Sequence, residues 1–177
     1  MKVRENQLLM ATPTMHQEEM SFIQEAFDKN WVAPLGFNCD GFEQEMVQYL
    51  SRDGSPKMHS LCLNSGTAAL HMAVKLAGIE AGDVVLASDT TFAATVNPIV
   101  YEGAVPVFVD MERQTWNMDP VALERAFEKH PQAKAVMLAH LYGTPAQMDE
   151  IRAVCQKHGA VLLEDAAEAL SATYKGQ

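Results

Sequence analysis

The sequence predicts an α/β fold in which a mainly parallel sheet is flanked by helices. From Ser60 onward, short apolar runs alternate with helical segments, a pattern typical of parallel strands buried on both faces. With 177 residues, of which 48% are hydrophobic and 20% charged, the chain can form one sizeable core rather than two domains. A polar, turn-rich connector separates an N-terminal helical segment with a loop, residues 1–57, from a partial α/β domain, residues 58–177.

The N-terminal segment is predicted to contain two helices. The stretch Thr14–Gln17 has the spacing of a capping box before one apolar helical face, and Asp40–Glu43 repeats this spacing before the next. Between them, Trp31–Gly36 contains proline and glycine and is expected to form a loop. Trp31 has a large apolar ring with an N–H donor at its tip, a combination common at interfaces. The alternative is that the ring covers the core.

In the second part, each short apolar run is a predicted strand. Segments with a helical period separate the runs, so the strands are expected to lie parallel. The predicted strands are Leu61–Asn64, Val84–Ser88, Val105–Asp110, Ala135–His140 and Ala160–Glu164.

Several residues predict where the intervening helices begin and end. Asp119 precedes a first-turn proline and is a predicted cap, and Thr144 begins a similar pattern. Gly159 is expected to stop the last helix. Pro98 would remove a backbone hydrogen bond inside a helix over Phe92–Tyr101, so that helix is expected to start late or to bend.

Polar residues follow the first predicted strand, where a helix begins. Backbone N–H groups and two hydroxyls of Ser65, Gly66 and Thr67 would converge at the positive end of that helix, which suits a phosphate group. The alternative is that Ser65 only caps the helix. The spacing fits neither a phosphate-binding nucleotide loop nor a paired-glycine dinucleotide fingerprint.

Asp165 follows the last predicted strand and places an anion at the same edge of the sheet. A ligand with a phosphate at one end and a basic ring nitrogen at the other could face both groups, and pyridoxal 5′-phosphate is such a ligand. An ionised carboxylate beside the ring nitrogen keeps that nitrogen protonated. Alternatively, Asp165 caps a helix over Ala166–Leu170. The neighbouring acids Glu164 and Glu168 suggest a metal site, but no suitably spaced histidine or further carboxylate joins them, so we predict no metal.

Aromatic residues also follow the strands. Phe92 could stack on a planar ring bound at this edge of the sheet. The alternative is that it packs in the core. His140 and Tyr142 could line the same site, although a histidine there is more often a hydrogen-bonded structural group.

Charge and cysteine content exclude several classes of protein. The net charge is −10 and there is no basic run, so we predict no nucleic-acid partner. Cys39, Cys62 and Cys155 share no ligand-like spacing and are expected to be reduced core thiols in a cytoplasmic protein. No apolar stretch approaches the roughly 20 residues that cross a bilayer, and the N-terminus lacks the apolar core of a signal peptide, so we expect no membrane association.

Six segments in register resemble the sugar aminotransferases of the DegT/DnrJ/EryC1/StrS family, and they cover nearly the whole chain. They are Trp31–Gly36, Asn64–Leu70, Phe92–Thr95, Pro106–Asp110, His140–Pro145 and Glu164–Leu170.

The resemblance implies the aspartate-aminotransferase (type I pyridoxal phosphate) fold, of which this chain would be an incomplete large domain. In that fold Asp165 would meet the pyridine nitrogen, Phe92 would stack on the ring and Glu168 would lie near the phenolic edge. The cofactor-binding residues would be Gly66, Thr67, Ala68, Phe92, Asp165 and Glu168.

The family's Schiff-base lysine lies well past the aspartate motif, so we expect it beyond Gln177 and predict no catalytic residue in this chain. Lys175 falls in an expected turn and is not assigned that role. The family's remaining strands and small domain are also missing, so we expect an N-terminal fragment that is inactive alone.

For the full-length enzyme, the resemblance implies a homodimer that catalyses ping-pong transamination. Glutamate would be the amino donor, and the acceptor would be a nucleotide-linked keto-sugar, a UDP-4-keto-6-deoxy hexose used in surface polysaccharide biosynthesis. Three alternatives stay open: a sugar dehydratase of the same family, in which histidine replaces the lysine; a non-catalytic fragment; and a nucleotide-binding module.

Overall fold

The structure is a computed structural model that describes residues 14–51 and 58–176. The chain divides into two compact units, Met1–Cys62 and Leu63–Gln177. The connector predicted after Ser51 lies outside the described residues, so the division at residue 57 stays a prediction.

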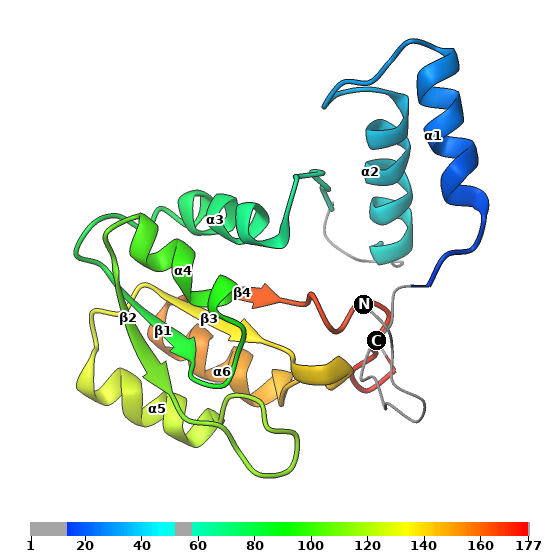
Figure 1. Ribbon diagram of the computed structural model, residues 1–177. Coiled ribbons are helices and arrows are strands. Elements are labelled where there is room, and N and C mark those ends of the chain that lie inside the picture. The colour runs from blue at the N-terminus through cyan, green and yellow to red at the C-terminus, as the bar shows by residue number, and fades with distance from the viewer. Residues whose placement is uncertain (1–13, 52–57, 177) are drawn as a thin grey trace, which may run out of the picture. The chain divides into compact units, whose positions relative to one another are not determined.

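The N-terminal unit contains helices α1, Glu18–Asp28, and α2, Phe37–Leu50, and neither helix has a buried residue (Figure 1). Both predicted capping boxes are wrong. Helix α1 begins after Gln17, and Asp40 lies inside α2. A capping motif is a local pattern, and here the chain turns into the helix at other residues.

The loop predicted over Trp31–Gly36 is confirmed, since no helix or strand includes these residues. The indole N–H of Trp31 donates to the backbone carbonyl of Leu35. Gly36 has a φ of +150°, and the indole occupies the space that a Cβ there would need. The ring therefore folds over its own loop and stays half exposed.

The second unit contains a four-stranded sheet in which all neighbouring strands are parallel, as the sequence predicts. In spatial order the strands are β2, Val105–Val109; β1, Val84–Ser88; β3, Ala135–Ala139; and β4, Val161–Asp165.

The first predicted strand, Leu61–Asn64, is wrong. These residues form no strand, and Leu61 is 63% exposed. An apolar run becomes a strand only where a neighbouring strand offers hydrogen bonds, and the sheet of the described residues does not include this segment.

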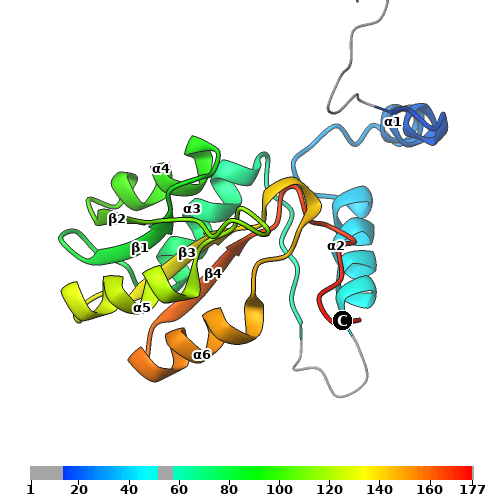
Figure 2. The same cartoon turned by 90° about the horizontal axis from the view of Figure 1, so that it is seen from below.

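Two helices cover each face of the sheet (Figures 1 and 2). Helices α3, Gly66–Leu76, and α4, Ala93–Tyr101, cover one face, while α5, Pro120–Lys129, and α6, Met148–His158, cover the other. Successive residues of a strand point to opposite faces, so β1 contributes to both cores. One core contains Val85, Ala87, Leu70, Val74 and Ile99, and the other contains Val84, Leu86, Leu123, Phe127 and Ile151.

The helix ends show which local signals hold. The Asp119 carboxylate accepts a hydrogen bond from the Val121 N–H at 2.9 Å, and Gly159 ends α6 with a φ of 66°, so both predictions are confirmed. Thr144 is not a cap, because α6 begins at Met148. Its carbonyl instead accepts a hydrogen bond from a distant side chain described below.

Helix α4 starts directly after Phe92 and carries Pro98 in its interior, so the late start is wrong, and the alternative that the helix bends stays a prediction. Pro98 is buried together with Ile99.

The expected core position of the cysteines holds only for Cys155. Burial raises the pKa of the Cys155 thiol to about 11. Cys39 is half-buried and Cys62 is exposed. None of the described helices has the length and apolar character that spanning a membrane requires.

Candidate functional site

A cavity of about 510 Å³ lies at the carboxyl edge of the sheet. Loops that follow β1, β3 and β4 form its walls together with the start of α3. Its size falls in the range of roughly 300–1,000 Å³ that is usual for small-molecule sites. Five of the six predicted cofactor-binding residues line it: Gly66, Thr67, Phe92, Asp165 and Glu168.

The start of α3 provides the predicted anion end of the cavity. The Ser65 hydroxyl accepts a hydrogen bond from the Ala68 N–H at 3.2 Å, which confirms Ser65 as the helix cap. The first amides of a helix have no acceptor within the helix and lie at its positive end. Gly66 and Thr67 at this end line the cavity, whereas Ala68 is not a lining residue and its amide is bound to Ser65.

Asp165 lies at the end of β4 and is held at both carboxylate oxygens. Its Oδ2 accepts a hydrogen bond from the Thr95 hydroxyl at 2.6 Å, and its Oδ1 accepts one from the Ala167 N–H at 3.2 Å. The helix predicted over Ala166–Leu170 is wrong, because these residues form turns. Asp165 therefore caps a turn while it lines the cavity.

The three neighbouring acids have separate partners. Glu164 accepts from His140 at 3.1 Å and lies 3.6 Å from the guanidinium of Arg152. The Glu168 carboxylate accepts from the Tyr142 N–H at 2.7 Å. Across residues 14–51 and 58–176, no three metal-ligating side chains are grouped so that they could hold an ion.

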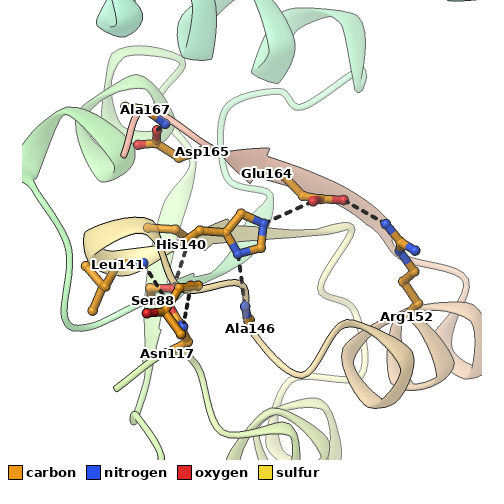
Figure 3. A network of polar contacts seen from close by, with 11 residues as sticks. Ser88, Asn117, His140, Leu141, Ala146, Arg152, Glu164, Asp165 and Ala167 are labelled. Atoms are coloured by element: carbon orange, nitrogen blue, oxygen red, sulfur yellow. Dashed lines mark hydrogen bonds and ion pairs between the residues drawn. The ribbon is translucent and has the colours of Figure 1, made fainter. Parts of the chain in front are cut away.

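His140 is buried, and Figure 3 shows its imidazole between Ala146 and Glu164. Its Nδ1 accepts a hydrogen bond from the Ala146 N–H at 3.2 Å, so the ring proton must reside on Nε2, which donates to Glu164. This hydrogen bond holds the pKa of the Glu164 carboxyl below its ordinary value. Both ring nitrogens are occupied, so His140 is a neutral structural group rather than a base.

Asn117 is a site-building residue that the sequence does not reveal. It is 1% exposed, its Oδ1 accepts from the Leu141 N–H at 2.9 Å, and its Nδ2 donates to the Thr144 carbonyl at 2.9 Å. These bonds hold the short 3₁₀ helix η1, Leu141–Gly143, at the cavity wall (Figure 3). Within it, Tyr142 adopts a left-handed conformation with φ 51°, which costs about 1 kcal/mol or more.

Phe92 is 81% exposed although it lines the cavity, so the core-packing alternative is wrong. An exposed apolar ring beside a cavity can stack on a planar ligand. Lys175, which the sequence places in a turn, forms an ion pair with Asp149 and is not a cavity residue.

The fold and the cavity define an α/β protein with a small-molecule site where the carboxyl ends of parallel strands meet. The model of the DegT/DnrJ/EryC1/StrS aminotransferase family matches residues 13–177, so the chain belongs to this family, as the sequence resemblance implies.

Two curated relatives and one solved structure illustrate the similarity. EpsN from Bacillus subtilis (strain 168), provisionally named a pyridoxal phosphate-dependent aminotransferase, is 43% identical over 96% of this chain and 44% of its own length. The GDP-perosamine synthase of Caulobacter vibrioides (strain ATCC 19089 / CIP 103742 / CB 15) is 36% identical over 95% of this chain and 43% of its own. An aminotransferase structure from Psychrobacter cryohalolentis has a TM-score of 0.82 at 32% identity, over 93% of this chain and 40% of that chain. The chain thus spans less than half the length of these proteins.

Proposed function

We propose that this chain supplies the cofactor-binding part of an aminotransferase site and that its ligand is pyridoxal 5′-phosphate. The observation that carries the proposal is that the start of α3 and the carboxylate of Asp165 line one cavity. We propose that residues 58–177 are part of the large domain of the aspartate-aminotransferase fold.

The residues of the cavity fit this cofactor. In the proposal, Gly66 and Thr67 hold the phosphate at the positive end of α3, and Phe92 stacks on the ring. Ala68, whose amide is bound to Ser65, is left out of the phosphate site. Asp165, which has no proton to donate when ionised, would face the ring nitrogen and keep it protonated.

When bound, the cofactor supplies an electron sink for the carbanion that transamination requires. The chain's own residues bind and orient it. Glu168, fixed by the Tyr142 N–H, would border the phenolic edge. Among the described residues, no lysine lines the cavity, and we propose that the reactive amine is supplied from beyond Gln177.

We further propose a nucleotide-linked keto-sugar as the amino acceptor, a UDP-4-keto-6-deoxy hexose, with glutamate as the donor. Membership in this family supports an amino transfer, and the similarity to a GDP-perosamine synthase supports a nucleotide-sugar. We also propose a cytoplasmic homodimer for the full-length protein. The exposed apolar side chains of α1, Met20, Phe22, Ile23 and Phe27, support self-association.

Pyridoxamine 5′-phosphate tests the proposal on the chain itself, because it carries the same ring and phosphate and needs no lysine as an anchor. We expect saturable binding by isothermal titration calorimetry. Asp165→Asn removes the charge that faces the ring nitrogen and should weaken binding by about tenfold or more.

Gly66→Ala probes the phosphate end in the same experiment. Apart from its own helix backbone and chain neighbours, no atom of the described residues lies within 4 Å of a Cβ at Gly66, so the fold should tolerate the change while a bound phosphate would not. We expect weaker binding with an unchanged unfolding midpoint in urea. The matched control Gly41→Ala, also in open space, should bind as the wild type does. Absence of wild-type binding would contradict the proposal and favour a non-catalytic fragment. Binding of UDP without binding of pyridoxamine 5′-phosphate would contradict it and favour a nucleotide-binding module.

A further inference from the structure

Thr95 is a buried polar residue in the first turn of α4 that the proposed function leaves without a role. It is 0% exposed, and its hydroxyl lies 2.6 Å from Oδ2 of Asp165, which is 70 residues away in the sequence. The Thr91 hydroxyl lies 2.7 Å from that of Thr95. A hydroxyl just before α4 and one in its first turn thus form a chain that ends at the carboxylate.

The direction of these hydrogen bonds follows from proton counting. An ionised carboxylate only accepts hydrogen bonds, so the single proton of the Thr95 hydroxyl is donated to Asp165. The Thr95 oxygen must then accept the proton of Thr91. Because Oδ1 accepts from the Ala167 N–H, both carboxylate oxygens are held by donors, an arrangement that stabilises the anion and fixes its plane.

We propose that Thr95 is a positioning residue that, supported by Thr91, holds the Asp165 carboxylate in one orientation toward the ring nitrogen of the cofactor. The inference rests on the proposed function, since it needs Asp165 to face that nitrogen. Packing alone does not require the hydroxyl, because a valine side chain would fill the buried position without a polar group that needs a partner.

The test compares Thr95→Val with Thr95→Ser in the 177-residue chain, using pyridoxamine 5′-phosphate. Two readouts are the dissociation constant and the circular dichroism that the protein induces in the ligand's absorption band, which reports a fixed ring orientation. Thr95→Val should bind about tenfold more weakly and show a reduced induced signal. Thr95→Ser keeps the donor and should restore both.

Ser88→Ala is the matched control. Ser88 is also buried at the end of a strand, and its hydroxyl accepts from the Ala139 N–H at 3.2 Å, but it does not line the cavity. Its loss should lower stability and leave both readouts unchanged.

Wild-type affinity and signal in Thr95→Val, or an equal loss in Ser88→Ala, would overturn the inference while the proposed function stands. If Thr95→Val does not fold, Thr91→Val, at a half-buried site, decides the matter: an induced signal equal to the wild type would overturn the inference, and a reduced one would support it. No binding by the wild-type chain would instead overturn the proposed function, and this inference with it.

Discussion

Asp165 and His140 are neighbouring polar residues of the cavity wall with opposite electrostatic roles. Asp165 accepts hydrogen bonds at both oxygens and keeps its charge beside the cavity. One ring nitrogen of His140 accepts a hydrogen bond from the Ala146 amide and the other donates to Glu164, so the ring carries no charge. The hydrogen-bond partners, rather than the residue types, decide which group can act on a ligand.

The His140–Glu164 pair predicts a pH effect on stability. The pKa of Glu164 is lowered from 4.5, chiefly by the hydrogen bond from His140. A carboxyl group whose pKa is lowered in the folded state stabilises the protein at pH values above its ordinary pKa. This stabilisation is lost as the pH falls through the folded-state pKa.

Glu164→Gln should therefore lower the urea midpoint at pH 7, and the gap to the wild type should shrink as the pH is lowered from about 5 to about 3. Urea unfolding of both proteins across this range measures the gap. A gap that stays constant would show that the charge of Glu164 contributes nothing.

Asp165 and Phe92 could be predicted as site residues because each lies at or shortly after the carboxyl end of a predicted strand, and the ends of parallel strands share one edge. Thr95 and Asn117 could not, since their partners lie 70 and 24 or more residues away and no local pattern marks them. Thr91 lies before the start of α4, so its spacing from Thr95 is no helical pattern either.

At the scale of elements, the strands follow from their own residues because a sheet covered on both faces requires continuous apolar runs. Helix starts are less local. Thr144 lies in a sequence typical of a helix cap, yet its carbonyl accepts a hydrogen bond from the Asn117 side chain and the helix begins at Met148. The residues of Leu61–Asn64 resemble a strand, but pairing depends on a neighbour that the run itself does not provide.

Gly159 offers a test of a helix end that the sequence predicts. Its φ of 66° is unfavourable for residues with a Cβ, so Gly159→Ala should lower the free energy of unfolding by about 1 kcal/mol. Asparagine adopts this conformation more readily, so Gly159→Asn should cost less. Equal stability of Gly159→Ala and the wild type in urea would contradict the assigned cap.

At the scale of the whole molecule, loops far apart in the chain build one cavity because the parallel strands end at one edge. Residues after β1, β3 and β4 meet there with the start of α3 (Figure 1). The chain belongs to an aminotransferase family and covers less than half of each relative. Both findings support the proposal that this cavity is part of a larger catalytic site.

A crystal structure of the chain grown with pyridoxamine 5′-phosphate tests the central claim most directly. We predict the phosphate within about 3 Å of the backbone amides of Gly66 and Thr67, and the ring nitrogen within about 3 Å of the Asp165 carboxylate. A ligand bound in the reverse orientation, or outside this cavity, would contradict the account.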